Sequence, residues 1–411
     1  MNDNYLVFLK ILKDSLNNKK THLDINLSRD EWRFLFKLAS VHDILPLFVN
    51  SVFEDSSLNQ YPQFKSQIIS RAKKITLSQA KKTFYFISLY QEMIEANLKP
   101  IIMKGIICRS LYPDPELRPS CDEDIYISSS EIFNYHKFLL DHGFLLVDPN
   151  IIDLLSQDEI SYYNKKTHLY LEIHQRLFPT SFPLFNRLNM FFPIPNKQVF
   201  ESIYDSYFYT LDYTEHLLYM LFHAYKHFLY SGIGIRQIAD IYLFSKKFDS
   251  LIDWNYIIQS CISINIQYFV SAIFSICFNY FGLDCNHHIL LLLDDYEIDE
   301  ESLLFDILSG GSYGTSSRDR LHSSNMVLET ASAYNDKRNS HGFTKTIFPN
   351  YIYMKQKYSF LNNRKYLLPY AWLLRLFDYF FSSHKRRTNF LHTIKIGTDR
   401  IAVLRKYHLI D

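Results

Sequence analysis

The chain of 411 residues is long enough for roughly two or three domains, and its 34 Phe and 31 Tyr against 10 Gly and 13 Pro favour long helices with aromatic cores. A net charge of +1 provides no overall field to attract nucleic acid, so nucleic acid is not expected as a partner. The five scattered Cys form no CxxC pair and the first residues lack a signal-peptide pattern, so we expect a cytoplasmic location. No apolar run is long and uncharged enough to predict a transmembrane segment.

Residues 1–96 are predicted to form a helical N-terminal region. The segment Ser28–Glu31 has the pattern of a capping box, which predicts a helix that begins there. Apolar residues at helical spacing from about Phe64 to Ala96 predict one long amphipathic helix that leads into the next region.

Residues 97–180 are predicted to form a small α/β core. The apolar run Ile101–Met103 predicts a short buried strand, and Lys104-Gly105 a turn into a short helix. A second strand is predicted to open with Asp122-Glu123-Asp124 and to continue to Ile127. A later strand at Leu169–Ile173 would carry Glu172 and the following His174 on the same face.

Residues 181–411 are predicted to return to helices. The glycine-rich segment Ser309–Ser317 lacks the GK[ST] ending of a P-loop, so we interpret it as a flexible connector. Residues 382–411 hold seven Lys or Arg and two Asp, which we interpret as a solvated helix face rather than a membrane or nucleic-acid contact. The predicted fold class is α+β, mostly α, with a small mixed β-sheet core between two helical regions. The clearest C-terminal helices are expected at Thr214–Tyr230, Ile233–Lys247, Trp254–Phe281 and Leu367–Phe381.

Three carboxylates on the predicted strands suggest a metal site. Asp122 and Asp124 point to the same side because successive strand residues alternate, and two like charges so close require a cation between them. Carboxylate oxygens suit Mg²⁺, and Glu172 on a neighbouring strand could complete a two-metal cradle for phosphoryl transfer. His174 could steady one of these carboxylates, although we favour an interior histidine.

Lys104-Gly105 is the expected phosphate-binding element of this site. Glycine permits close approach of the backbone, the following helix start offers free N–H groups, and the lysine adds a positive charge. Further along the chain, His223 and His227 are four residues apart and share a helix face, but the Glu of an HExxH zinc motif is missing.

The order of these motifs resembles the DNA polymerase β superfamily of nucleotidyltransferases, in which a strand, a Gly turn and a helix precede two carboxylates one residue apart. The chain is more closely similar to an uncharacterised bacterial nucleotidyltransferase family with the series KG, LYPDP, LR and DxD. These motifs are Lys104-Gly105, Leu111–Pro115, Leu117-Arg118 and Asp122-x-Asp124.

This resemblance implies an enzyme that moves a nucleoside monophosphate from a nucleoside triphosphate, with ATP the expected one, to an unidentified small molecule, peptide or protein. It implies that Asp122, Asp124 and Glu172 are catalytic and bind Mg²⁺, with Mn²⁺ as an alternative. Lys104, Gly105 and Arg118 would bind the triphosphate. His223 and His227 would belong to a helical wall around the nucleotide, with structural packing as the other interpretation.

One departure from the family pattern is Glu123, because an apolar residue is usual between the paired carboxylates. Either Glu123 is solvated, or it pairs with a cation such as Arg118, which is also a candidate for the triphosphate. The third carboxylate, Glu172, stands where Asp is common. These departures favour an alternative hypothesis, a non-catalytic nucleotide-binding or interaction protein that retains the fold. An RNA-modifying transferase is a third, which would require a basic groove.

Overall fold

The computed structural model of the chain describes residues 3–193, 198–230, 232–284, 299–311, 351, 354–355, 358–361, 364–381 and 390–409. Its strands are β1 (Ile101–Met103), β2 (Glu123–Tyr126), β3 (Leu145–Leu146), β4 (Glu159–Tyr163), β5 (Tyr170–His174), β6 (Gln198–Ile203) and β7 (Ser206–Leu211). Its α-helices are α1 (Asp3–Leu16), α2 (Arg29–Val41), α3 (Leu45–Val52), α4 (Ser56–Asn59), α5 (Pro62–Glu95), α6 (Gly105–Arg109), α7 (Ile132–Asp141), α8 (Pro183–Asn186), α9 (Tyr213–Tyr230), α10 (Ile235–Phe248), α11 (Trp254–Ser263), α12 (Gln267–Ile276), α14 (Glu300–Gly310), α18 (Leu368–Phe381) and α19 (Phe390–Lys406).

The predicted α+β class and the two helix signals of the N-terminal region are confirmed. Ser28 caps α2, and Glu31 closes the capping box by accepting the Ser28 N–H at 2.7 Å. The long predicted helix is α5, which runs for 34 residues and delivers the chain to β1. Residues 312–317 of the glycine-rich segment and 382–389 of the basic tail lie outside the described residues.

The sheet is mixed and has the strand order β3-β4-β5-β2-β1-β7-β6. Strand β2 lies between β1, which is antiparallel to it, and β5, which is parallel to it. The register places Asp124 opposite Met103 on one side and beside Glu172 on the other. Side chains from two distant segments therefore meet at the middle of the sheet.

The hairpin of β6 and β7 corrects the prediction that residues after 180 are helical. Its turn residues, Tyr204 and Asp205, have positive φ angles of 51° and 58°, as a two-residue hairpin turn requires. Because neither residue is Gly or Asn, the usual sequence signal of such a turn is missing.

The helix predicted over Trp254–Phe281 is also corrected, because the chain forms two helices, α11 and α12. Asn265 between them has a left-handed φ of 61°, which no α-helix can contain. A single apolar run hides this break, because the helical spacing of apolar residues resumes directly after it.

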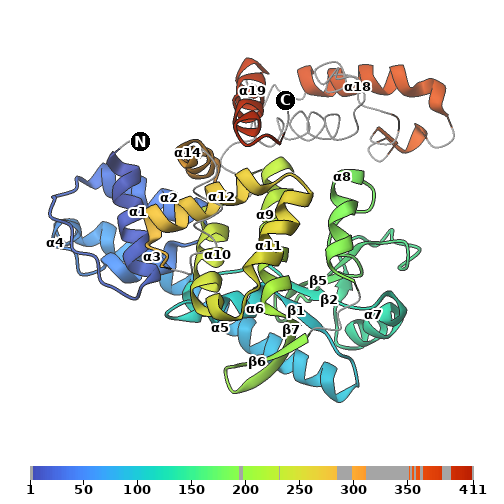
Figure 1. Cartoon of the computed structure of the whole chain (residues 1–411), viewed down its shortest axis with the longest axis horizontal. Coiled ribbons are helices and arrows are strands. Elements are labelled where there is room, and N and C mark those ends of the chain that lie inside the picture. Colours follow the sequence, from blue (N-terminus) through green and yellow to red (C-terminus); the bar gives the residue numbers. More distant parts are fainter. Residues whose placement is uncertain are drawn as a thin grey trace.

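One cluster of buried apolar side chains connects all three regions of the chain, from Phe8 in α1 through Ile125 in β2 to Leu409. Figure 1 shows α1 to α4 at one end of the molecule and the sheet at the other, with α10 and α12 between them. A smaller cluster around Met354, Leu361 and Ala371 contains the start of α18.

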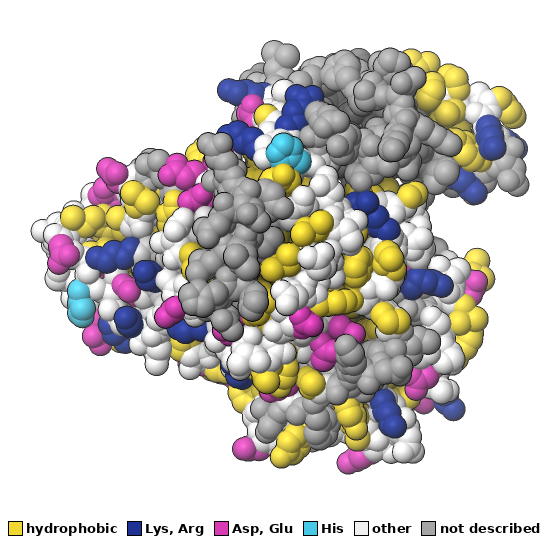
Figure 2. Space-filling view, viewed as in Figure 1, with side chains coloured by type: hydrophobic (Ala, Val, Ile, Leu, Met, Phe, Trp, Pro, Cys, Tyr) yellow, Lys and Arg dark blue, Asp and Glu magenta, His cyan; other side chains and the backbone are white. Residues whose placement is uncertain are grey.

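The surface carries both signs of charge. On the face shown in Figure 2, Lys and Arg side chains are interspersed with Asp and Glu, in keeping with the net charge of +1. Among the helices in the described part of the chain, none combines the length and apolar character that crossing a membrane requires.

Candidate active site at the end of strand β2

The turn after β1 is formed by Lys104 and Gly105. Lys104 has a φ of 46°, which is uncommon for a residue with a side chain, and its N–H donates to Nε2 of His216 at 3.0 Å. Gly105 has a φ of 30°, and a Cβ atom there would lie 2.1 Å from Oε2 of Glu123. The turn therefore requires glycine, because any side chain at this position would collide with a buried carboxylate.

Glu123 is buried and belongs to the packing of this turn. It pairs with a cation, as one of the two sequence interpretations expected, but the cation is Arg109 and not Arg118. Its Oε1 lies 2.5 Å from Nη2 of Arg109, and its Oε2 accepts the N–H of Ile106 at 3.0 Å. Burial raises the pKa of Glu123, and the Arg109 charge opposes this shift. Glu123 is thus neither solvated nor paired with Arg118; it anchors α6 to the sheet.

Asp124 lies at the centre of the site and is 4% exposed. Its Oδ2 is 3.1 Å from Nζ of Lys104, and its Oδ1 is 3.1 Å from Nε2 of His174. Burial by itself would raise the pKa of Asp124, but the contacts with Lys104 and His174 outweigh it and lower the pKa below its usual range. Asp124 is therefore ionised near neutral pH.

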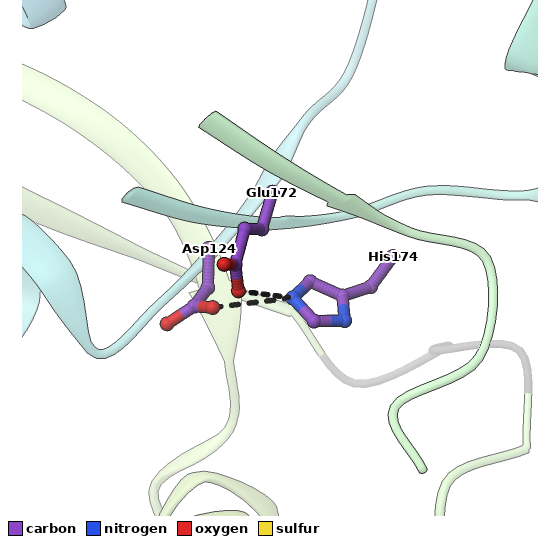
Figure 3. A group of neighbouring side chains, drawn as sticks. All are labelled: Asp124, Glu172 and His174. Carbon is purple, nitrogen blue, oxygen red and sulfur yellow. Dashed lines mark hydrogen bonds and ion pairs between the residues drawn. The ribbon is translucent and has the colours of Figure 1, made fainter. Parts of the chain in front are cut away.

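Glu172 and His174 extend from β5 toward Asp124, as Figure 3 shows. One donor atom from each of these three residues lies within 4.8 Å of the other two, so the group could hold a metal ion. Burial, together with the charges of Asp124 and Glu159, raises the pKa of Glu172 to about 9. A proton on Glu172 relieves the repulsion between the carboxylates when no cation is bound.

Asp122 directly precedes β2 and lies in a pocket on the other side of Asp124. Burial and the charge of Asp124 raise its pKa. The pocket has about 350 Å³ of free space, its open mouth included. It is lined by Lys104, Gly105, Arg118, Ser120, Asp122, Asp124, His223, Arg236, Gln237 and Asp240. Asp122 and Asp124 therefore share the pocket with a third carboxylate, Asp240, and with three basic side chains from α10 and the segments around α6.

Arg118 lines this pocket and is held in place by Asp240 of α10. Its Nε and Nη2 donate to the two oxygens of Asp240 at 2.7 and 2.6 Å. Tyr112 donates to the same carboxylate at 2.8 Å. The remaining nitrogen, Nη1, is buried without a hydrogen-bond partner among the described residues. A buried charged donor left in this way is suited to bind an anion.

The segment that leads to Asp122 is fixed through its backbone. Gln79 of α5 accepts the N–H of Ser120 at 2.8 Å, and Lys82 of the same helix donates to the Ser120 carbonyl. Arg236 of α10 donates to the Pro119 carbonyl at 2.5 Å. Helices on either side of the site in the sequence thus determine where Asp122 lies.

Helix α9 brings the two predicted histidines toward the site in different ways. His223 lines the pocket, and its Nε2 is 2.9 Å from Nζ of Lys104. His227 lies behind it, with its Nε2 at 3.1 Å from Nε2 of His223. Burial lowers the pKa of both, and the charges of Lys104 and Lys226 add to the effect. Both histidines are therefore neutral near pH 7.

Sequence patterns gave no role to several residues of this site, among them Arg109, His216 and Gln237. Arg109 follows Gly105 by four residues, and the need of Glu123 for a cation was the signal that could have indicated it. The packing of α9 and α10 brings two more residues to the site: His216 accepts the Lys104 N–H, and Gln237 lines the pocket. No local signal marks His216 as a site residue, because the Lys104 N–H that it accepts lies 112 residues away in the chain.

Fold and site together define an α+β protein in which carboxylates and basic side chains converge at the end of a central strand. The chain belongs to a family of uncharacterised nucleotidyltransferases, whose family model matches residues 28–282. This stretch contains the whole sheet and every residue of the pocket. Searches of curated proteins and of solved structures returned no match. The family expected from the motifs is confirmed, and the relation to the polymerase β superfamily stays a prediction.

Proposed function

We propose that the protein is a divalent-metal-dependent nucleotidyltransferase of the polymerase β type. It would transfer a nucleoside monophosphate from a nucleoside triphosphate, with ATP the expected one, to an acceptor and release pyrophosphate. The observation that carries this proposal is the shared pocket, in which Asp122 and Asp124 lie together with Lys104, Arg118 and Arg236. Carboxylates that hold a metal and cations that hold phosphates are the two requirements of this reaction.

The metal would be Mg²⁺, with Mn²⁺ as the alternative, held by Asp122, Asp124 and Glu172. The donor atoms of Asp124 and Glu172 are close enough together to bind one ion. Such an ion, when bound, neutralises the phosphate oxygens and lowers the barrier to in-line attack on the α-phosphorus. Asp122, which lines the pocket, would hold the ion on the side where the triphosphate enters.

The triphosphate would lie against Lys104, Gly105 and Arg118. The unpartnered Nη1 of Arg118 supports a phosphate contact, because binding an anion would satisfy this buried donor. Gly105 has no side chain, so it lines the pocket with its backbone. His223, which lines the pocket, and His227 behind it would form the wall next to the nucleotide. The acceptor would be a small molecule, a peptide or a protein.

Glu123 had favoured a non-catalytic protein, because a charged residue between the paired carboxylates departs from the family pattern. Its ion pair with Arg109 and its hydrogen bond to Ile106 account for this charge by packing alone. The presence of Glu123 is therefore compatible with turnover, and the catalytic proposal is preferred.

The double variant Asp122→Asn, Asp124→Asn tests the proposal. Pyrophosphate release is assayed with each of the four nucleoside triphosphates in turn, with cell extract as the source of acceptor. We expect the metal-dependent release seen with the wild-type protein to fall at least 100-fold in the double variant. The reason is that neutral amides hold a divalent ion far more weakly than carboxylates do. The exposed Asp24→Asn serves as the matched control and should keep full activity. Undiminished pyrophosphate release by a folded double variant would refute the site.

A further inference from the structure

The position of His174 is that of a metal ligand, because its ring lies near two carboxylates, Asp124 and Glu172, and not only one. Its Nε2 lies 3.1 Å from Oδ1 of Asp124 and 3.8 Å from Oε2 of Glu172 (Figure 3). When two ligand atoms each lie about 2.1 Å from a metal ion, and the angle at the ion is between a right angle and the tetrahedral angle, the two atoms are about 3 to 3.5 Å apart. Small shifts of Glu172 would therefore bring all three atoms onto a single ion.

The second nitrogen of His174 faces another carboxylate. Nδ1 lies 3.7 Å from Oε2 of Glu159, which is the direct cross-strand neighbour of His174 in the pairing of β4 with β5. Metal-binding histidines commonly present one nitrogen to the ion while the other N–H points to a carboxylate, which sets the tautomer. Since His174 is 3% exposed, its ring contacts these neighbours and not bulk water.

The two oxygens of Asp124 face different partners. Oδ2 lies toward Lys104 on the pocket side, whereas Oδ1 lies toward His174. An ion between Asp124, Glu172 and His174 therefore does not need to displace the Lys104 ammonium. Lys104 would keep its contact with Oδ2 of Asp124.

We propose that His174 is a direct nitrogen ligand of the metal at Asp124 and Glu172, and that the site consequently prefers a first-row transition metal over Mg²⁺. Mg²⁺ selects oxygen ligands, whereas imidazole nitrogen binds Mn²⁺, Fe²⁺ or Zn²⁺ better. This inference rests on the metal site of the proposed function and reverses its order of ions, because it places Mn²⁺ and related transition metals ahead of Mg²⁺.

Electron paramagnetic resonance with Mn²⁺ as the probe tests this inference on the full chain without any nucleotide. Loss of the six-line signal of free Mn²⁺ reports binding, and electron spin-echo modulation reports a nitrogen bound to the ion. The protein is prepared with ¹⁵N-histidine, so that the modulation is assigned to imidazole and not to lysine or backbone nitrogen. Because His216, His223 and His227 lie in the same region, the His174 variant then shows which histidine gives the signal.

We expect histidine nitrogen modulation in the wild-type protein, and Mn²⁺ binding that excess Mg²⁺ displaces poorly. His174→Gln should abolish the modulation and weaken Mn²⁺ binding at least 10-fold, while Mg²⁺ binding changes less. The exposed His22→Gln is the control and should change neither. Mn²⁺ binding by the wild-type protein without histidine modulation would overturn the inference, as would equal competition by Mg²⁺.

Absence of histidine modulation in the wild-type protein overturns the inference even where the His174 variant fails to fold. In that case His223→Gln is the second variant: modulation that survives it supports His174, and modulation lost with it overturns the inference. Pyrophosphate release with Mg²⁺, measured on the same preparations, separates this inference from the proposed function. Release that depends on Asp122 and Asp124, in a protein without histidine modulation, would leave the proposed function standing and remove only the role of His174.

Discussion

Glu123 lies between two candidate metal ligands, yet its side chain points away from them and holds α6 in place. Alternation along β2 separates the two tasks: the flanking aspartates line the pocket, and the residue between them reaches Arg109 under the turn. The Arg109 and Glu123 side chains are 0% and 4% exposed. A pair buried to this extent is costly to break, because the remaining charge has no solvent.

Replacing Arg109 by Met should therefore lower the free energy of unfolding by roughly 3 to 5 kcal/mol, measured by urea denaturation. Adding Glu123→Gln removes the stranded charge and keeps an acceptor for the Ile106 N–H, so the double variant should recover part of the loss. Arg33→Ala, which breaks the exposed pair with Asp30, is the control and should cost about 1 kcal/mol or less. A loss from Arg109→Met no larger than that of the control would show that the buried pair has no structural role.

At the scale of elements, α9 contributes a row of neutral histidines that support the Lys104 turn. His216 accepts the Lys104 N–H through Nε2, and its Nδ1 is 3.1 Å from Oγ1 of Thr210 in β7. Burial and the Lys104 charge lower the pKa of His216 to about 3. Protonation of His216 would remove the acceptor for the Lys104 N–H, so the turn requires the neutral ring.

This arrangement predicts a loss of stability in mild acid. In the unfolded chain a histidine takes up a proton below about pH 6.5, whereas His216 in the folded protein does not do so until about pH 3. The unfolded state thus binds more protons in this interval, and stability falls as the pH drops from 6.5, by about 1.4 kcal/mol per pH unit for each such histidine. Urea denaturation between pH 7.5 and 5 measures the slope.

His216→Gln should reduce this slope by about 1.4 kcal/mol per pH unit, which corresponds to one proton, because glutamine does not titrate. His22→Gln, at an exposed position, should leave the slope unchanged. If the two variants have the same pH dependence as the wild-type protein, His216 is not a source of acid sensitivity.

At the scale of the whole molecule, the sheet and the helical regions share one hydrophobic core. Strand β1 pairs with β7, which lies beyond residue 180, and Phe208 of β7 stacks against Phe86 of α5. The pocket likewise takes Arg236 and Asp240 from α10. The site is therefore completed by elements on both sides of the predicted core in the sequence.

A fragment of residues 97–180 should consequently fail to fold alone, whereas residues 1–311 should unfold cooperatively on heating. The shorter fragment lacks the partner strand of β1 and the helices that bury the sheet. Thermal unfolding followed by circular dichroism distinguishes the two outcomes. A cooperative transition in the 97–180 fragment would instead establish that region as an independent domain.

Much of the fold was predictable where the signal is local. The capping box at Ser28, the long helix α5 and the short strand β1 were all found from neighbouring residues. The hairpin β6–β7 was missed because its left-handed residues, Tyr204 and Asp205, are not the glycine or asparagine that usually marks such a turn. The break at Asn265 was missed because the helical spacing of apolar residues resumes directly after it. Tertiary packing fixes these backbone conformations, and sequence propensity only permits them.

For the candidate site, the sequence by itself pointed to the candidate residues: Lys104-Gly105, the alternating pair Asp122 and Asp124, and Glu172. Alternation and motif order suffice for this, because they depend on residues close together in the chain. Only the tertiary structure decided the partners, pairing Glu123 with Arg109, Arg118 with Asp240 and Asp124 with His174. Partners of buried charges are set by register and helix packing between distant segments, which no local pattern encodes.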